Sequence, residues 1–287
     1  MNAALWGALS AVSFGVGDLA ARFSSRALGA FRALFGTLLV GAVLVTAWVV
    51  WSAPPMAWPL QHLWLLAANG ILVTLAILLL YKALARGPVS VAAPLVATYP
   101  AFVVAIAVAL GARPTAIQWI AMAGVLLGAV LLGVAAEEGE KHKEGARQSV
   151  MPTVLMAGAA AAIYALSVVA GQRAVPVFGE LQTLWSARVV SLAAIVVLMA
   201  ALRISPVAPR RWWPVLALQG VLDTGGFLFL FIGSAGQDPE VAAVTGSCFG
   251  AVTTLLAWLV LRERITPLQW CGIVVVFAGV AVLAGQK

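Results

Sequence analysis

Long apolar runs separated by short polar segments extend along the whole chain. A helix needs roughly 20 apolar residues to cross the hydrocarbon core of a bilayer, and it satisfies its own backbone hydrogen bonds there. The pattern therefore predicts an all-α integral membrane protein. Its ten expected transmembrane helices cover residues 3–21, 31–51, 63–81, 90–110, 116–136, 150–171, 181–202, 212–233, 241–261 and 267–285.

One polar run divides these expected helices into two groups of five. It reads EEGEKHKEGARQ and covers Glu137–Gln148. We expect residues 1–136 to form a first five-helix repeat, residues 137–149 a polar linker and residues 150–287 a second five-helix repeat. Because each group holds an odd number of spans, the second group would enter the bilayer from the opposite side. The predicted fold is thus a pair of inverted five-helix repeats.

Sequence similarity between the two halves supports this division. The segment that begins at Arg113 matches the segment that begins at Arg264, with a shared QW pair and a shared glycine at equal spacing. In the second span of each half, a shorter match places Arg32 over Arg188. Duplicated and inverted halves are typical of secondary transporters, in which the halves move about a site near the middle of the bilayer.

Composition agrees with a membrane protein. Hydrophobic residues make up 63% of the 287 residues, charged residues 9%, and the mean hydropathy is +1.05, whereas soluble domains are about half apolar and a quarter charged. The net charge of +7 is spread over many short segments, so we expect no nucleic-acid partner. Cys248 and Cys271 lie inside apolar runs, and His62 and His142 lie outside span interiors. We therefore expect no disulfide framework, metal site or cofactor.

Basic residues are divided unequally between the two predicted faces. The loops after odd-numbered spans hold Arg22, Arg26, Lys82, Arg86, Lys141, Lys143, Arg147, Arg203, Arg210, Arg211, Arg262 and Arg264. The other face holds Arg113, Arg173 and Lys287. Because basic loops accumulate on the cytoplasmic side, this count places the linker in the cytoplasm and both termini outside.

Two stretches of sequence resemble a known family. LRERITPLQWCGIVVVFAGVAVL closes the second half, and ALARGPVSVAAPLVATYPAFVVAIAVALGARPTAIQW closes the first. Together with the duplicated ten-span layout they resemble the drug/metabolite transporter (DMT) superfamily, specifically its EamA-like branch, over essentially the whole chain. Glu263 and Arg264 stand at the "gER" position of that family, whereas the first half has Ala112 where the family usually has a glutamate.

The resemblance implies a carrier in the inner membrane of a bacterium that moves small metabolites, such as amino acids or related compounds. Efflux is the expected direction and protons are the candidate coupling ion. The family is usually drawn with both termini in the cytosol, opposite to the orientation that the loop charges predict. We expect the bilayer as surroundings and a monomer or a weak homodimer as the assembly.

Two other functions stay open at this point. A lipid-carrier flippase of the same superfamily is an alternative that the sequence does not separate from a metabolite exporter. An intramembrane enzyme is less favoured, because such an enzyme needs a nucleophile with a base, or a metal with His and carboxylate ligands, inside its spans. We therefore expect no catalytic site.

Charged side chains inside predicted spans are the first site candidates, because a charge at mid-helix costs about 2.5 to 3.5 kcal/mol on insertion scales. Asp223 lies near the centre of the eighth span and shares a helix face with Gln219. Asp223 either carries a proton or a cation, or forms a structural pair with Arg188. Arg188 either contacts substrate or extends toward its nearer interface. Asp18 is a further candidate, for which an ion pair with Arg22 at i+4 is the alternative.

Two predicted spans contain weak points at corresponding places. The fourth span holds Pro94 and Pro100, each of which removes a helical hydrogen bond. The ninth span holds a glycine between two hydroxyl residues. Interrupted segments at matching places of two halves indicate a transport site, although kinks that serve packing are an equal explanation. The candidate residues at these weak points are Thr98, Tyr99, Thr245 and Ser247.

Aromatic, hydroxyl and amide side chains of other spans complete the predicted cavity, although each also suits a packing role. They are Phe14 and Ser13 in the first span, Asn69 and Thr74 in the third, and Tyr164 and Ser167 in the sixth. In the fifth span, Gly124 and Gly128 form a small-xxx-small face that predicts close helix packing.

Overall fold

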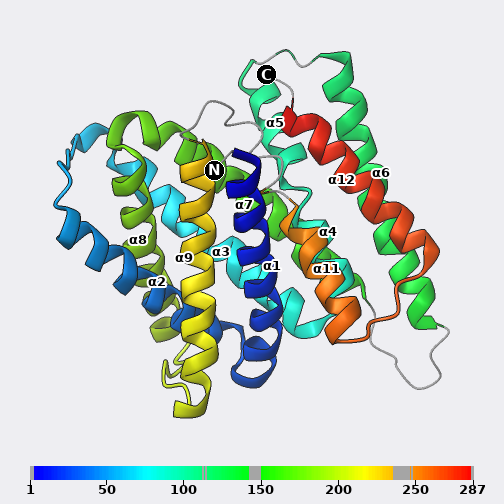
Figure 1. Ribbon diagram of the computed structural model, residues 1–287, viewed down its shortest axis with the longest axis horizontal. Coiled ribbons are helices and arrows are strands. Elements are labelled where there is room, and N and C mark those ends of the chain that lie inside the picture. The colour runs from blue at the N-terminus through cyan, green and yellow to red at the C-terminus, as the bar shows by residue number, and fades with distance from the viewer. Residues whose placement is uncertain are drawn as a thin grey trace.

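The computed structural model describes residues 3–111, 113, 115–141, 150–234, 246 and 248–285, and its regular elements there are helices (Figure 1). Before the linker they are α1 (Ala3–Leu28), α2 (Ala30–Ser52), α3 (Leu63–Arg86), α4 (Val89–Val96), α5 (Tyr99–Ala109) and α6 (Ala116–Lys141). After it they are α7 (Met151–Phe178), α8 (Glu180–Ala201), α9 (Trp213–Ser234), α11 (Phe249–Val260) and α12 (Pro267–Gly285). Short 3₁₀ turns, η1 (Leu60–His62) and η2 (Arg210–Trp212), lead into α3 and α9. The predicted all-α class is confirmed.

Several of these helices can cross a bilayer. Within the described ranges, five are long and apolar enough by length and composition: Ala30–Ser52, Leu60–Arg86, Met151–Phe178, Glu180–Ala201 and Arg210–Leu230. Shorter apolar helices cover Val89–Val103, Trp119–Gly128, Phe249–Val260 and Pro267–Gly279. Large apolar side chains also stand on the outer helix surfaces, where lipid rather than water suits them. The chain is therefore a multi-pass membrane protein.

The fourth predicted span is interrupted between its two prolines. α4 ends before Ala97 and α5 begins after Thr98. Both residues lie between Pro94 and Pro100. A proline has no N–H to donate, so carbonyls one turn earlier lose their helical partner. At the interruption, the N–H and the hydroxyl of Thr98 both donate to the carbonyl of Leu95, at 3.2 and 2.7 Å. The predicted weak point in this span is confirmed.

Helices of the two halves exchange equivalent packing partners. α1 packs against α9 and α11, as α7 packs against α3 and α5, and α2 packs against α9 as α8 packs against α3. Two further contacts join a helix to its own counterpart, namely α6 to α12 and α2 to α8. In Figure 1 α6 and α12 lie together at one edge of the molecule, with α2 and α8 at the opposite edge. The largest apolar core includes Leu34, Leu84 and Ile195 from α2, α3 and α8.

Glycines at two of these contacts show how the sequences of the two halves align. A Cβ placed on Gly70 of α3 would lie 2.5 Å from Val190 Cβ of α8. A Cβ placed on Gly220 of α9 would lie 2.5 Å from Val40 Cβ of α2. Gly220 and Val190 each lie 150 positions after their counterparts, so both contacts obey one spacing. The helices approach this closely because neither glycine has a side chain.

The same spacing corrects the predicted alignment of the second span. Gly29 and Gly179 precede α2 and α8 with positive φ angles of 84° and 78°, and they too are 150 positions apart. Arg188 therefore corresponds to Leu38, and the predicted equivalence of Arg188 with Arg32 is wrong. The match around the arginines is only a few letters long, whereas a turn with positive φ demands glycine and so preserves the true register.

α6 and α12 meet through one glycine each. A Cβ on Gly128 would lie 2.8 Å from Val276 Cγ2, and a Cβ on Gly279 would lie 2.6 Å from Val125 Cγ2. A Cβ on Gly124 would meet no described atom within 4 Å. Of the two glycines of the predicted packing face, Gly128 thus lies at the contact and Gly124 does not.

Candidate functional site

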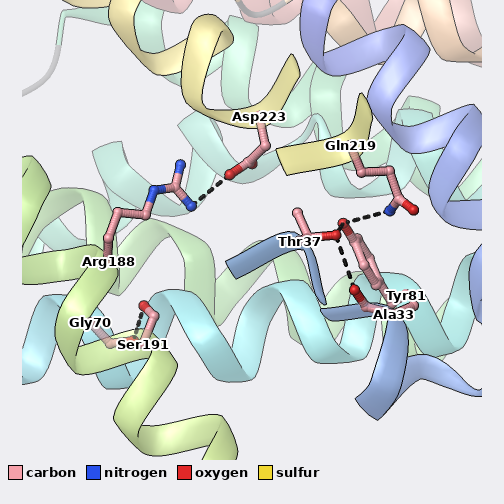
Figure 2. Close-up of polar contacts among 8 residues, drawn as sticks. All are labelled: Ala33, Thr37, Gly70, Tyr81, Arg188, Ser191, Gln219 and Asp223. Carbon is pink, nitrogen blue, oxygen red and sulfur yellow. Dashed lines mark hydrogen bonds and ion pairs between the residues drawn. The ribbon is translucent and has the colours of Figure 1, made fainter. Parts of the chain in front are cut away.

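An ion pair joins the middle of α8 to the middle of α9. Arg188 Nη1 lies 2.6 Å from Asp223 Oδ2, and the two side chains are 4% and 19% exposed (Figure 2). Both helices pack on α2, where a Cβ on Gly41 would lie 2.9 Å from Thr224 Oγ1 and 3.8 Å from Arg188 Nε. The bare backbone of Gly41 therefore leaves the space in which the guanidinium reaches α9. The structure brings together the two residues that the sequence proposed as a pair.

Polar atoms around this pair have unused hydrogen-bonding capacity. Arg188 Nε and Nη2, Gln219 Oε1 and Thr224 Oγ1 are buried and have no hydrogen-bond partner among the described residues. The guanidinium lies 4.9 Å from the ring centroid of Phe227, which contributes a cation–π contact. Buried polar groups are nearly always paired, and leaving one unpaired costs about 1–3 kcal/mol. The arrangement therefore offers donors and acceptors to a small polar ligand.

A chain of hydrogen bonds lies one helical turn from the ion pair. Gln219 Nε2 donates to Tyr81 Oη at 3.2 Å, Tyr81 donates to Thr37 Oγ1 at 3.4 Å, and Thr37 donates to the carbonyl of Ala33 at 3.0 Å (Figure 2). This chain links α9, α3 and α2. Gln219 and Asp223 stand four residues apart on one face of α9, as the sequence predicts.

Asp18 of α1 does not pair with Arg22. The hydroxyl of Thr253 in α11 donates to Asp18 Oδ2 at 3.3 Å. Arg22 instead donates through Nη1 to the carbonyl oxygens of Leu84 and Ala85. The i+4 ion pair considered for these residues is therefore wrong. The last carbonyls of a helix have no helical partner, and the long guanidinium side chain reaches those of α3.

Phe14 and Tyr164 make equivalent ring contacts in α1 and α7. Phe14 meets Phe249 of α11 with centroids 6.2 Å apart, and Tyr164 meets Tyr99 of α5 at 4.9 Å, both edge to face. Tyr164 lies 150 positions after Phe14, and Phe249 lies 150 positions after Tyr99. Phe14 also contacts Phe227 at 5.1 Å. Phe14 therefore supports the ring on which the guanidinium lies, whereas the two tyrosines pair with each other.

Hydroxyl candidates elsewhere bond to nearby backbone. Thr74, Thr98 and Ser167 each donate at 2.7 Å to a carbonyl three or four residues earlier. Such a bond satisfies the hydroxyl within its own segment. None of these contacts is with the ion pair, although Ser191 of α8 bonds the same Gly70 carbonyl as Thr74, at 2.9 Å (Figure 2). The hydroxyl groups of Thr74, Thr98 and Ser167 are therefore satisfied by their own segments and do not contact the ion pair.

Of the remaining candidates, two can be placed and two cannot. Ser13 is buried in α1. Asn69 Nδ2 would lie 3.2 Å from a Cβ on Gly171, so Asn69 faces α7. Thr245 and Ser247 lie outside the described residues. In the ranges that the structure describes, no group of three His, Cys, Asp or Glu side chains is arranged to hold a metal ion.

Sequence reasoning missed several residues of the site. Phe227 follows Asp223 by four positions, and this spacing on a helix is the signal that could have identified it. Tyr81 looks like the last residue of an apolar run, and only the fold brings its hydroxyl to Gln219. Gly41 has no local signal beyond being a glycine inside a span, because its role depends on two helices of the other half.

The glutamate of the "gER" position caps a helix of the other half. Glu263 Oε1 accepts from the backbone N–H of Val89 at 3.0 Å, and Oε2 accepts from that of Ser90 at 2.9 Å. These N–H groups open α4 and have no partner within the helix. The positive end of the helix dipole adds to the attraction for a carboxylate.

Two more side chains bind the same connection between α3 and α4. Arg22 of α1 holds the last carbonyls of α3, and Thr153 Oγ1 of α7 donates to the Gly87 carbonyl at 2.8 Å. We call Arg22, Thr153 and Glu263 the end clasp. By the spacing of 150 or 151 positions, its equivalents in the other half are Gln172, Ala3 and Ala112. None of these three side chains is charged, so the second half has no equivalent of Arg22 and the first half has none of Glu263.

Comparisons with known proteins agree with the fold and the duplication. The model of the EamA-like transporter family matches residues 1–134 and again residues 151–285. No curated protein matches the chain in a sequence search. A solved structure titled "Crystal structure of protein" is 19% identical, covers 98% of this chain and 95% of its own, and superimposes with a TM-score of 0.65. That likeness shows a shared fold. Since the family model spans nearly the whole chain in two copies, the protein belongs to the EamA-like transporter family of the drug/metabolite transporter superfamily.

Proposed function

We propose that the protein is a secondary active transporter that moves a small metabolite, an amino acid or a related compound, across the inner membrane of a bacterium by alternating access. The observation that carries the proposal is the buried Arg188–Asp223 pair with unused donors on Arg188. Charges inside membrane helices are costly and usually mark an ion or substrate path. A purely structural pair is expected to have its remaining donors satisfied.

The free atoms of the site favour a substrate with a carboxylate. Arg188 Nε and Nη2 form one side of a guanidinium, and that side can donate two parallel hydrogen bonds to a carboxylate. Thr224 Oγ1 and Gln219 Oε1 can accept hydrogen bonds from an ammonium group. An α-amino acid carries both groups on one carbon. Membership of a transporter family supports transport as the function.

The architecture that suits this function is a pair of inverted five-helix repeats, residues 1–136 and 150–287, joined by the polar linker 137–149 and crossing the membrane ten times. Two findings support it: the exchange of equivalent packing partners and the two copies of the family model. In such a fold the site lies where the halves meet, and rocking of one half exposes it to each side in turn. The ion pair of the second half rests on Gly41 of the first, so this motion would act directly on it.

Efflux driven by protons is the transport mode that we propose. When a substrate carboxylate occupies Arg188, Asp223 loses its cationic partner, and an unpaired charge inside a membrane helix is costly. Asp223 would then exchange Arg188 for a proton. Loop charges support an orientation with the linker in the cytoplasm and the termini outside.

A metabolite comparison tests the proposal without a known substrate. Cells that overproduce the protein, cells that lack it and cells that overproduce Asp223→Asn are compared by mass spectrometry of the medium and the cell extract. We expect a compound with a carboxylate to be enriched in the medium by the wild type and not by the variant, at equal amounts of folded protein. Glu180→Gln is the matched control, because it neutralises an exposed acid in the first turn of α8.

Transport in reconstituted vesicles then tests proton coupling with the compound so found. An imposed pH gradient should drive its movement by the wild type, and Asp223→Asn should abolish the response to the gradient. Unchanged transport by Asp223→Asn, with the same response to the gradient, would remove the ion pair from the mechanism. Enrichment of a long-chain lipid-linked compound in the first comparison would favour a flippase instead.

A further inference from the structure

A pocket of about 480 Å³ lies at one end of the bundle, between the end of α1, the start of α2, the end of α3 and α7. Its lining includes Ser25, Arg26, Gly29, Lys82 and Arg86, and three apolar residues complete it. The transport site proposed above uses none of these five residues. We call this space the basic pocket.

Three cationic side chains line the basic pocket. Arg26, Lys82 and Arg86 are exposed, and no carboxylate among the described residues lies within ion-pair distance of them. Lys82 Nζ lies 5.0 Å from the ring centroid of Phe31, a contact that positions the ammonium at the start of α2. Three like charges around one space repel one another, so a bound anion would relieve an unfavourable arrangement.

α2 begins at this pocket with an uncapped N-terminus. Gly29 is its N-cap, makes no side-chain capping bond and has a φ of 84°. The first turn of α2 contains no acidic residue. The first N–H groups of a helix have no helical partner, and the helix dipole adds positive potential there. A helix of 23 residues therefore directs its positive end at a pocket already lined by three cations.

A buried hydroxyl points to a ligand independently of these charges. Ser25 is 2% exposed, lines the pocket, and its Oγ has no hydrogen-bond partner among the described residues. A helical serine ordinarily bonds to a carbonyl of the preceding turn, as the neighbouring Ser24 does with the Ala21 carbonyl at 3.3 Å. The unused hydroxyl of Ser25 is therefore free to donate to a ligand in the pocket.

The equivalent helix start in the other half has no such features. α8 follows Gly179 and carries its own acid, Glu180, in the first turn. The positions equivalent to the serine and the first arginine hold Val175 and Pro176, and the position equivalent to Lys82 holds Ile232. One helix start thus has a negative charge of its own, whereas the other presents an excess of positive charge to whatever occupies the basic pocket.

We propose that the basic pocket binds an anionic phosphate group and that its source is the headgroup of a membrane lipid such as phosphatidylglycerol. Phosphate oxygens accept charge-assisted hydrogen bonds from guanidinium groups and accept readily at helix N-termini. The pocket lies at the ends of helices that are long and apolar enough to span a bilayer, where headgroups are expected. Basic pockets between transmembrane helices are suited to anionic headgroups.

Thermal unfolding of the full-length protein in a neutral detergent tests this site. The midpoint is followed while short-chain phosphatidylglycerol, short-chain phosphatidylcholine or sodium phosphate is added. We expect phosphatidylglycerol to raise the midpoint with saturation and phosphatidylcholine to have little effect. Each cation near an anionic headgroup contributes about a fivefold change in affinity, so Arg26→Gln and Lys82→Gln should each weaken the response about fivefold. Ser25→Ala should weaken it without lowering the midpoint of the lipid-free protein.

Arg211→Gln is the matched control. Arg211 is an exposed cation of η2. The segment that joins α8 to η2 contacts the start of α2, because Arg32 Nε donates to the Ser205 carbonyl at 2.9 Å. Arg211 lies outside the lining of the pocket, and its substitution should leave the response unchanged. A response to sodium phosphate as strong as that to lipid would support the site but assign it to a soluble anion. The proposal is overturned if neither phosphate source raises the midpoint, or if the three pocket variants all respond like the wild type.

Discussion

Arg188 of α8 and Asp223 of α9 meet at 2.6 Å above the bare backbone of Gly41, so their ion pair rests on α2, a helix of the other half. A displacement of one half against the other would therefore change the surroundings of the pair even if α8 and α9 moved together. The pair is both a structural link and the charged centre of the proposed transport site. These two roles give separate expectations for stability and for transport.

Removing one partner of the pair should destabilise the fold more than removing both. Arg188→Gln or Asp223→Asn leaves a buried group without its partner, which costs about 3–5 kcal/mol for buried pairs. The double variant Arg188→Gln/Asp223→Asn leaves no unpaired charge and should cost less than either single variant. The free energy of unfolding in detergent, measured as a double-mutant cycle, gives the coupling. Additive losses would show that the pair contributes nothing as a pair.

A methyl group at Gly41 should disturb the ion pair. The new Cβ would lie 2.9 Å from Thr224 Oγ1, closer than carbon and oxygen tolerate. Overpacking of this kind costs typically about 1–3 kcal/mol, so Gly41→Ala should lower the unfolding temperature and reduce transport. Gly124→Ala is the control, because its Cβ would meet no described atom within 4 Å and alanine favours helix. Equal effects of the two substitutions would contradict the role given to Gly41.

Sequence reasoning identified the helices and their weak point because both follow from local rules. An apolar run of bilayer length can bury its backbone polar groups only as a helix, and the interruption at Ala97 and Thr98 follows from the flanking Pro94 and Pro100. The pairing of Arg188 with Asp223 was one of the predicted alternatives because few other charges lie inside the spans.

The errors arose where partners come from distant parts of the chain. Arg22 has an acid at i−4, yet it binds carbonyls 62 and 63 residues away, because helix ends offer unpaired acceptors that a linear pattern does not show. The register of Arg32 and Arg188 failed for a related reason. Short apolar matches recur by chance in helices of similar composition, whereas Gly29 and Gly179 are fixed by backbone geometry.

Neutralising Glu263 should loosen the start of α4. Both of its carboxylate oxygens accept backbone N–H groups, at 3.0 and 2.9 Å, and hydrogen bonds to a charged group contribute about 1.5–3 kcal/mol each. Glu263→Gln keeps one acceptor and loses the charge, so the amides of Val89 and Ser90 should exchange with deuterium at least about tenfold faster. Hydrogen–deuterium exchange by mass spectrometry measures this. Glu180→Gln should leave these amides unchanged, and equal exchange in both variants would contradict the capping role.

Cysteine labelling from the two sides of the membrane tests the inverted arrangement on which the transport mechanism rests. Arg113 and Arg264 precede the matching QW helices α6 and α12, and both are exposed. In inverted halves these equivalent positions must face opposite sides, because an odd number of spans separates them.

Single Arg113→Cys and Arg264→Cys substitutions are made after Cys248 and Cys271 are replaced by alanine. The variants are treated with a membrane-impermeant maleimide on intact cells and on inside-out vesicles. We expect the Arg113→Cys variant to react from outside and the Arg264→Cys variant from the cytoplasm, as the loop charges predict. Reaction of both from one side would exclude inverted halves, and reaction with the sides exchanged would keep them but reverse the predicted orientation.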